Sequence, residues 1–190
     1  MRTEDGFMHA WSIPAQIEET AWQALHDDLI LVLRGASRQL EHDRSGDALA
    51  VLRGPEGMGH LRLDAGEIAF NGNSFLGQAG DPFGIERRAR RAVLARVGSS
   101  GRRTVRRCDT RGYPYDLAVC AALLVVLRNL GDAARVGTSG TLRSGWGHAA
   151  TLVRATLGQC GQLIQLENGI LRWIDAPAAT ATARVRSNAS

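Results

Sequence analysis

The stretch PYDLAVCAALLVVLRNL, residues 114–130, decides the fold class more than any other part of the chain. Pro114 suits the first turn of a helix, where its missing N–H is not needed, and Gly131 suits the helix end. Residues 117–127 are apolar on every side of the predicted helix, so this element should be the most buried one. The run has 11 residues, whereas a membrane-spanning helix needs about 20, so the stretch predicts a core helix.

An amphipathic helix is predicted upstream, from about residue 13 to residue 34. Ser12 can cap its N-terminus, Pro14 fits its first turn, and Gly35 follows its last residue. Trp22 lies off the apolar stripe of this helix, and a second packing surface explains it best. The stripe recurs at helical spacing and consists of Ile17, Ala21, Leu25, Leu29 and Val32.

Short apolar runs separated by glycine-rich turns predict an antiparallel sheet between these two helices. Residues 88–97 fit a short helix, and a long ribbon leading into the strand at residues 104–108 fits nearly as well. The other predicted strands are residues 48–53, 60–63, 67–71, the region of Phe83 and Ile85, and residues 104–108.

After the central helix, the sequence predicts a short strand over residues 134–137 and a third helix beginning near Gly145. A C-terminal hairpin follows, because Asn168-Gly169 is typical of a two-residue type I′ turn. This turn would pair Leu166 with Leu171 and Ile164 with Trp173.

These elements predict one α+β domain over residues 1–175. The domain is expected to contain an antiparallel sheet with a buried central helix, two further helices and a C-terminal β-hairpin. Residues 176–190 lack hydrophobic periodicity and predict a disordered tail.

The composition limits the class of protein and its compartment. The 190 residues are 44% hydrophobic and 22% charged, which is typical of a globular domain. All 23 basic residues are arginine, which excludes mechanisms that need a catalytic or phosphate-binding lysine. Three cysteines are too few for a disulfide framework, and residues 1–10 lack the features of a secretory signal. We therefore expect a cytoplasmic protein that does not bind a membrane.

Charge segregation is the most distinctive feature of the sequence. Residues 87–111 contain ten arginines and one acid, Asp109, whereas the whole chain has a net charge of +4. Arginine binds phosphate and carboxylate groups bidentately, so a shared cationic surface would attract a polyanion or an acidic protein. A solvated basic face explains the segment equally well. The candidate binding residues are Arg87, Arg88, Arg90, Arg91, Arg102, Arg103, Arg106, Arg107 and Arg111.

A weaker candidate for an anion site is the glycine-rich connection over residues 137–148, which contains Arg143 and precedes a predicted helix N-terminus. Its glycine spacing matches neither a P-loop nor a dinucleotide-binding fingerprint. A plain tight connection is the favoured interpretation, and no cofactor is predicted.

Cys108, His148 and Asp116 supply the residue types of a thiol nucleophile, a base and an orienting acid, with Asp109 as an alternative acid. Residue types do not fix geometry, so catalysis is not the leading hypothesis. Cys120 lies inside the apolar helix and is expected to belong to the core. The five histidines are scattered without metal-binding spacing, so no metal site is predicted.

Several short motifs follow one another along the middle of the chain. They are Gly54-Pro55-x-Gly57-x-Gly59, Phe70-Asn71-Gly72, Asp81-Pro82-Phe83, and Cys108-x-Thr110 followed by Pro114-Tyr115-Asp116. Over residues 50–130 this order resembles a bacterial protein family without an assigned activity. In that family the segment after the cysteine tends to carry lysine, where this chain has Asp109, Arg111 and Gly112. The resemblance therefore implies neither an activity nor a shared ligand.

We expect a non-catalytic binding or accessory protein whose arginine-rich surface engages nucleic acid or an acidic protein. An accessory factor of a phage or mobile element is one form of this hypothesis. A cysteine-dependent hydrolase or transferase using Cys108 is the alternative. The best-placed arginines lie along or beside the predicted strand at residues 104–108, and they are Arg102, Arg103, Arg106 and Arg107.

Overall fold

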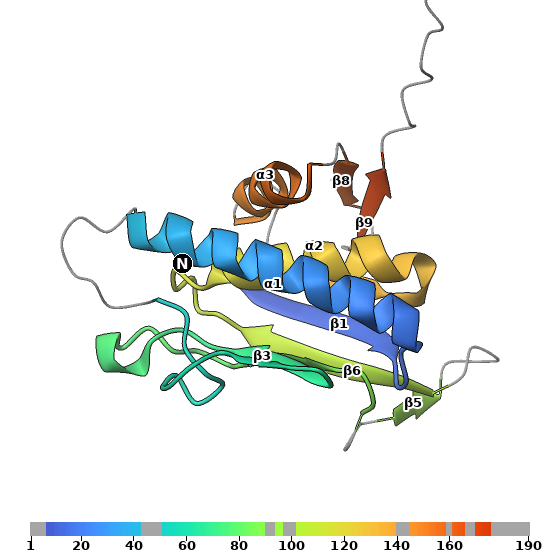
Figure 1. Cartoon of the computed structure of the whole chain (residues 1–190), viewed down its shortest axis with the longest axis horizontal. Helices are drawn as coiled ribbons and strands as arrows, with labels where there is room; N and C mark the ends of the chain where they lie inside the picture. Colours follow the sequence, from blue (N-terminus) through green and yellow to red (C-terminus); the bar gives the residue numbers. More distant parts are fainter. Residues whose placement is uncertain are drawn as a thin grey trace, which may run out of the picture.

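Two antiparallel sheets and three α-helices form the part of the chain that the computed structural model describes (Figure 1). The described residues are 7–42, 51–89, 94–96, 102–139, 145–158, 161–165 and 170–175. The larger sheet has the strand order β5-β6-β1-β7-β9-β8, and the smaller has the order β2-β3-β4. Their strands are β1 (Met8–Pro14), β2 (Arg62–Asp64), β3 (Glu67–Phe70), β4 (Phe83–Glu86), β5 (Leu94–Arg96), β6 (Arg102–Asp109), β7 (Arg135–Thr138), β8 (Gly161–Gln165) and β9 (Ile170–Asp175).

The central helix α2 (Asp116–Leu130) packs against the other two helices, α1 (Glu19–His42) and α3 (Gly145–Leu157). Residues 118–126 of α2 have no exposed surface, as expected for a helix that is apolar all round. In Figure 1, α1 runs along the molecule beside α2. Short 3-10 turns, η1 (Ser74–Leu76) and η2 (Gly131–Ala133), complete the secondary structure of the described residues.

The six-stranded sheet has one face that points toward the core. On β1, His9, Trp11 and Ile13 are buried, whereas the residues between them are exposed or half-buried. Directly paired residues of neighbouring strands share a face. The register therefore places Cys108 beside His9 and Arg106 beside Trp11 on the core side.

The smaller sheet also covers this core side. The ring of Phe83 on β4 lies 5.1 Å from that of Trp11, and Phe70 on β3 lies 4.9 Å from Phe83. Trp22 on α1 is 1% exposed, and its indole N–H donates to the carbonyl oxygen of Ala65 at 2.6 Å. Trp22 thus joins α1 to the β2–β3 turn, which explains its position off the apolar stripe.

The predicted α+β class, buried central helix, two further helices and terminal hairpin are confirmed. The third helix begins at Gly145, as predicted. Residues 94–96 form a strand paired with β6, in agreement with the ribbon alternative for that region. The strand predicted over residues 134–137 spans Arg135–Thr138.

The predicted start and end of the first helix are wrong. Residues 8–14 form the central strand β1, so Ser12 is not a helix cap. The helix begins at Glu19, and the Glu18 carboxylate caps it by accepting hydrogen bonds from the backbone N–H groups of Thr20 and Ala21. Gly35 does not end α1, because α3 packs directly against it and the helix continues to His42.

The predicted hairpin register is also wrong by one residue. Leu163, not Ile164, pairs with Trp173, and Gln165 pairs with Leu171. In the observed register, Leu163 and Trp173 both pack against the core. Burial of the apolar face of both strands therefore sets the pairing. The Asn168-Gly169 turn and residues 176–190 lie outside the described residues.

The strand predicted over residues 48–53 does not form in its described part, residues 51–53. Arg53 makes only an isolated bridge with Asn71. The chain turns at Gly54, whose N–H donates to the carbonyl oxygen of Met58 at 3.0 Å, so pairing cannot continue. Residues 48–50 lie outside the described part of the chain.

Among the described residues, no helix combines the length and the apolar character needed to cross a membrane. This finding agrees with the prediction that residues 117–127 belong to a core helix.

Two leucines of α1 provide a test of the packing. Leu29 has no exposed surface, whereas Leu31 is 47% exposed. Leu29→Ala should lower the free energy of unfolding by about 2–5 kcal/mol, because it leaves a cavity in the core. Leu31→Ala is the matched control and should change it by less than about 0.5 kcal/mol. Urea unfolding followed by circular dichroism measures both values, and equal losses would contradict the described orientation of α1.

Candidate functional site

The side of the six-stranded sheet that points away from the helices has no covering element within the described residues. We call this side the open face. Three of its apolar side chains, Met8, Val105 and Ile174, are 43%, 45% and 50% exposed. Its outward positions on β1, β6, β7 and β9 carry one acid, Asp109, together with Met8, Ala10, Ser12, Pro14, Arg103, Val105, Arg107, Arg135, Gly137, Ile170, Arg172 and Ile174.

The arginine-rich segment does not present one continuous surface. Successive side chains on a strand point to opposite faces, so Arg103 and Arg107 lie on the open face while Arg102 and Arg106 lie on the other. Arg106 forms an ion pair with Glu86 at 3.0 Å. The expected single cationic surface is therefore divided between the two faces of β6.

The remaining predicted arginines are dispersed. Arg87 forms an ion pair with Glu19 on α1. Arg88 is exposed and forms an isolated bridge with Gln16, and Arg111 is exposed in the turn after β6 with a φ of 53°. Three candidates lie outside the described residues, and they are Arg90, Arg91 and Arg143.

Two arginines that sequence reasoning missed join the open face. Arg135 on β7 and Arg172 on β9 are both exposed. The register places Ser12 between Val105 and Arg135, so Arg135 lies about 10 Å from β6 across one intervening strand. Arg172 makes an exposed ion pair with Asp132 at 2.9 Å. The open face thus gathers four arginines from three strands.

Arg103 anchors this group. It is 7% exposed, and its guanidinium donates to the Ser12 hydroxyl and to the carbonyl oxygens of Ser12 and Ala133 at 2.7–2.9 Å. Burial lowers the pKa of Arg103, and the positive charge of Arg135 lowers it further. Arg103 bonds to Ser12, and Arg135 is the cross-strand partner of Ser12, so the two like charges share one part of the open face. An anion bound beside them would relieve their repulsion.

The three residues of the alternative hydrolase site lie in different environments. Cys108 on β6 has no exposed surface and donates to the carbonyl oxygen of Asp81 at 3.1 Å. His148 is exposed on α3, and no hydrogen bond between described residues joins it to Cys108. Burial raises the pKa of Cys108 to about 12, so the thiol is protonated near neutral pH. Asp116 pairs with His9 instead.

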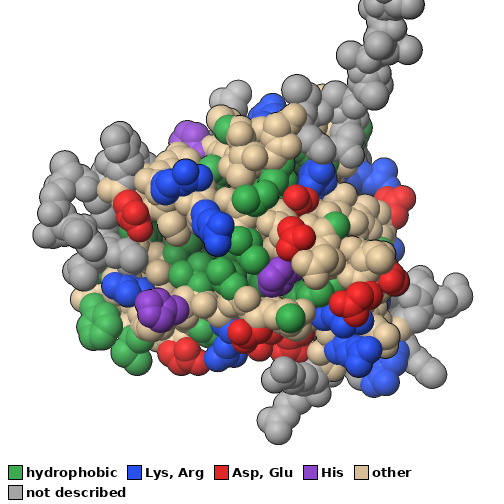
Figure 2. All heavy atoms as spheres, viewed as in Figure 1, with side chains coloured by type: hydrophobic (Ala, Val, Ile, Leu, Met, Phe, Trp, Pro, Cys, Tyr) green, Lys and Arg blue, Asp and Glu red, His purple; other side chains and the backbone are tan. Residues whose placement is uncertain are grey.

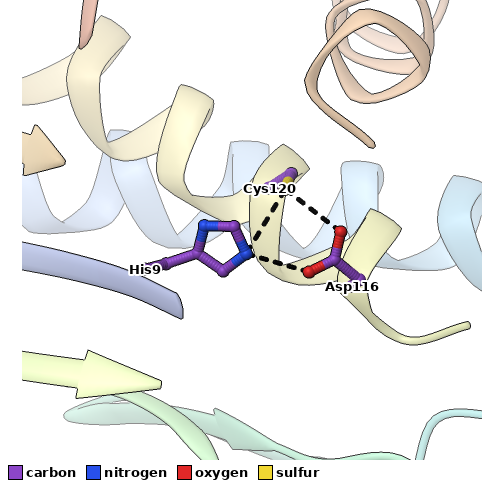
Figure 3. Close-up of side chains that lie close together, drawn as sticks. All are labelled: His9, Asp116 and Cys120. Carbon is purple, nitrogen blue, oxygen red and sulfur yellow. Dashed lines mark hydrogen bonds and ion pairs between the residues drawn. The ribbon is translucent and has the colours of Figure 1, made fainter. Parts of the chain in front are cut away.

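A buried cluster that the sequence analysis did not predict joins His9, Asp116 and Cys120. Figure 3 shows these side chains converging from β1 and α2. Nε2 of His9 lies 2.9 Å from Oδ1 of Asp116 and 3.9 Å from Sγ of Cys120, while Sγ lies 3.7 Å from Oδ2 of Asp116. All three residues are at most 8% exposed. Burial raises the pKa of Cys120 well above its ordinary value.

Hydrogen bonds from three further parts of the chain surround this cluster. Asp116 also accepts from the Thr110 hydroxyl, at the end of β6. The Thr138 hydroxyl on β7 lies 3.2 Å from Nδ1 of His9, and this hydroxyl accepts a hydrogen bond from the Trp146 indole N–H on α3 at 3.4 Å. The buried polar atoms of the cluster are therefore partnered, which is the condition for keeping a carboxylate inside a core.

Gly145 allows α3 to approach the cluster. A Cβ atom at this position would lie 2.6 Å from Oδ2 of Asp116. The first residue of α3 therefore has to be small. The Asp116 carboxylate is also favoured beside this helix end, because the backbone N–H groups there carry partial positive charge.

The motifs that resemble the bacterial family meet around Tyr115. The Tyr115 ring packs closely against Gly72, because a Cβ atom on Gly72 would lie 2.8 Å from it. The Tyr115 hydroxyl donates to the carbonyl oxygen of Asp81 at 2.9 Å. The Asn71 amide donates to the carbonyl oxygens of Pro55 and Gly80. These contacts hold the long connection around η1 against the start of α2. A structural role therefore explains why these motif residues occur, and no activity is needed to explain them.

A groove of about 1020 Å³ lies between α1, α3 and the β2 region, on the side of the larger sheet opposite to the open face. Figure 2 shows hydrophobic atoms gathered at the centre of the molecule in this view, with arginine side chains nearby. Five leucines and two arginines of α1 are among the residues that line the groove, and they are Leu31, Leu33, Leu61, Leu63, Leu152, Arg34 and Arg38.

Comparison with known proteins identifies no relative: no family model, curated protein or solved structure matches the chain.

Thiol labelling tests the environment of Cys108. With a pKa of about 12, its thiolate fraction at pH 8 should be about three orders of magnitude below that of an ordinary cysteine. In a Cys160→Ser background, a chromogenic disulfide reagent should label no cysteine in the native protein and two after denaturation. Rapid native labelling at Cys108, located by peptide mass spectrometry, would instead favour the thiol-nucleophile hypothesis.

Removing the Asp116 carboxylate tests the importance of the buried cluster. Asp116→Ala leaves His9, Thr110 and Cys120 without their shared acceptor, so the free energy of unfolding should fall by about 3–5 kcal/mol. The control is Asp132→Ala, which removes a surface ion pair and should cost less than about 1 kcal/mol. Chemical unfolding of both variants measures the difference, and a small loss for Asp116→Ala would show that the cluster stabilises little.

Proposed function

We propose that this chain is a non-catalytic binding protein whose open face docks onto an acidic protein surface. The single observation that carries the proposal is the uncovered sheet face that carries Arg103, Arg107, Arg135 and Arg172 together with exposed apolar side chains. A rigid sheet fixes the spacing of these groups, so a partner meets a preformed surface.

The charges on the open face support an anionic partner. Arg107 and Arg135 are exposed, and the guanidinium of Arg103 is fixed by three hydrogen bonds to Ser12 and Ala133. Ser12 is also the cross-strand partner of Arg135. Carboxylates on a partner would reduce the repulsion between these cations and would bind the exposed guanidinium groups of Arg107 and Arg135 bidentately.

The apolar side chains favour a protein over nucleic acid as the partner. Met8, Val105 and Ile174 are each 43–50% exposed among the arginines. Protein interfaces are enriched in arginine and methionine and bury apolar side chains of this kind. Single-stranded nucleic acid is bound largely by stacking on aromatic side chains, and the described positions of the open face carry none.

The environment of Cys108 supports a non-catalytic role over the hydrolase alternative, because a buried and protonated thiol is a poor nucleophile. Free thiols at Cys108 and Cys120 are consistent with a reducing compartment, which supports our proposal of a cytoplasmic protein. A phage or mobile-element accessory factor remains one biological setting for such a binding protein.

Site-specific photocrosslinking tests the proposal in cells that naturally encode the protein. A photoreactive amino acid at Val105 should give a discrete adduct that nuclease treatment does not remove. The adduct should be lost in Arg107→Glu/Arg135→Glu, because reversing two charges should weaken binding at least about tenfold. The control carries the same amino acid at Leu31, on the helical side of the sheet, and should not give this adduct.

Other outcomes would contradict the proposal. An adduct that nuclease removes would identify nucleic acid as the partner. The same adduct from both positions, or its persistence after charge reversal, would show that the open face does not select the partner. The absence of any adduct from Val105 would exclude the open face as a docking surface in those cells.

A further inference from the structure

We propose that His9, Asp116 and Cys120 form a binding site for a divalent transition-metal ion of the Zn²⁺ type. The donor atoms are Nε2 of His9, a carboxylate oxygen of Asp116 and Sγ of Cys120, which all lie within 4.8 Å of one another. This inference is independent of the proposed partner binding, because the site lies in the core and not on the open face.

The spacing of the donor atoms is close to that of a tetrahedral site. Zn²⁺ bonds of about 2.0–2.3 Å hold neighbouring ligand atoms about 3.3–3.6 Å apart. Here the Sγ–Nε2 and Sγ–Oδ2 distances are 3.9 and 3.7 Å, and the Nε2–Oδ1 distance is 2.9 Å. The two short carboxylate distances involve different oxygens, but one donor atom from each residue lies within 4.8 Å of the other two, so small side-chain adjustments would bring the three donors around one ion.

The types of donor select the class of metal. Imidazole nitrogen and thiolate sulfur suit Zn²⁺ and Co²⁺, whereas Mg²⁺ and Ca²⁺ prefer sites made of oxygen atoms. The Asp116 carboxylate and a Cys120 thiolate together carry two negative charges, which balance those of a divalent cation. A neutral assembly can remain buried at much lower cost than an isolated charge.

The surroundings of His9 can orient it as a metal ligand. The Thr138 hydroxyl lies 3.2 Å from Nδ1, on the side of the ring away from Asp116. A hydroxyl can both donate and accept a hydrogen bond, so it can partner either tautomer of the ring. The Trp146 ring packs edge-on against His9 with a centroid separation of 5.3 Å, which further limits the ring's orientation. Such a partner on the second ring nitrogen is typical of metal-binding histidines.

Metal binding would rearrange protons in a defined way. A carboxylate accepts hydrogen bonds, so without a metal the Nε2–H tautomer of His9 and the Cys120 thiol both donate to Asp116. With a metal, the imidazole proton moves to Nδ1, where it faces Thr138, and the thiol proton is released to solvent. The metal forms bonds to Nε2, Sγ and a carboxylate oxygen, so one proton is released for each ion bound.

Cobalt spectroscopy of the full chain tests the site, in a Cys160→Ser background that removes the thiol outside the described residues. We expect one equivalent of Co²⁺ to bind and to give a thiolate-to-metal charge-transfer band, with release of one proton at near-neutral pH. Zn²⁺ should displace Co²⁺ and remove the band. Cys120→Ala should abolish the band, whereas the matched control Cys108→Ala, also a buried thiol, should keep it.

The cobalt spectrum of the background protein by itself can overturn the proposal. No saturable binding, or binding without the charge-transfer band, would show that the cluster is only a hydrogen-bonded core. A band that persists in Cys120→Ala would assign the metal to another thiol. Circular dichroism of Cys120→Ala and of a second variant, His9→Gln, confirms folding, and loss of the band in both folded variants supports the site.

Discussion

The burial of the Asp116 carboxylate is the constraint on which the rest of the structure depends. A carboxylate inside a core has to be supplied with hydrogen-bond donors, or its desolvation opposes folding. Here the donors come from His9 on β1, Thr110 after β6 and Cys120 one turn further along α2. Meeting this requirement fixes the start of the central helix against the middle of the sheet.

This arrangement extends outward through neighbouring residues. Tyr115 precedes Asp116 and holds the connection around η1 through the carbonyl oxygen of Asp81. On the other side, Gly145 lets the N-terminus of α3 approach the carboxylate, and Trp146 then reaches Thr138. The start of α2 therefore positions two sheets and a second helix at once. The same polar centre that holds them also has the donor set of a metal site.

Strand β6 shows why a charge-rich sequence segment need not form a charge-rich surface. Its arginines occur as two adjacent pairs, and adjacent residues on a strand point to opposite faces. One member of each pair faces the core side, where Arg106 meets Glu86. The other member joins Arg135 and Arg172, which are distant in sequence. The resulting cationic face is smaller than the segment suggested, but it is rigid and carries exposed apolar groups.

The sequence alone determined the α+β class and the central helix. An apolar run of this length is too short to cross a membrane, so only a protein core can shield it from water. It did not determine β1, whose Trp11 and Ile13 alternate over too few residues to outweigh the nearby helix signals. Only the tertiary structure brought together His9, Asp116 and Cys120, because the first is separated from the others by more than a hundred residues. Local patterns set which elements form, whereas strand pairing and helix packing decide which distant side chains meet.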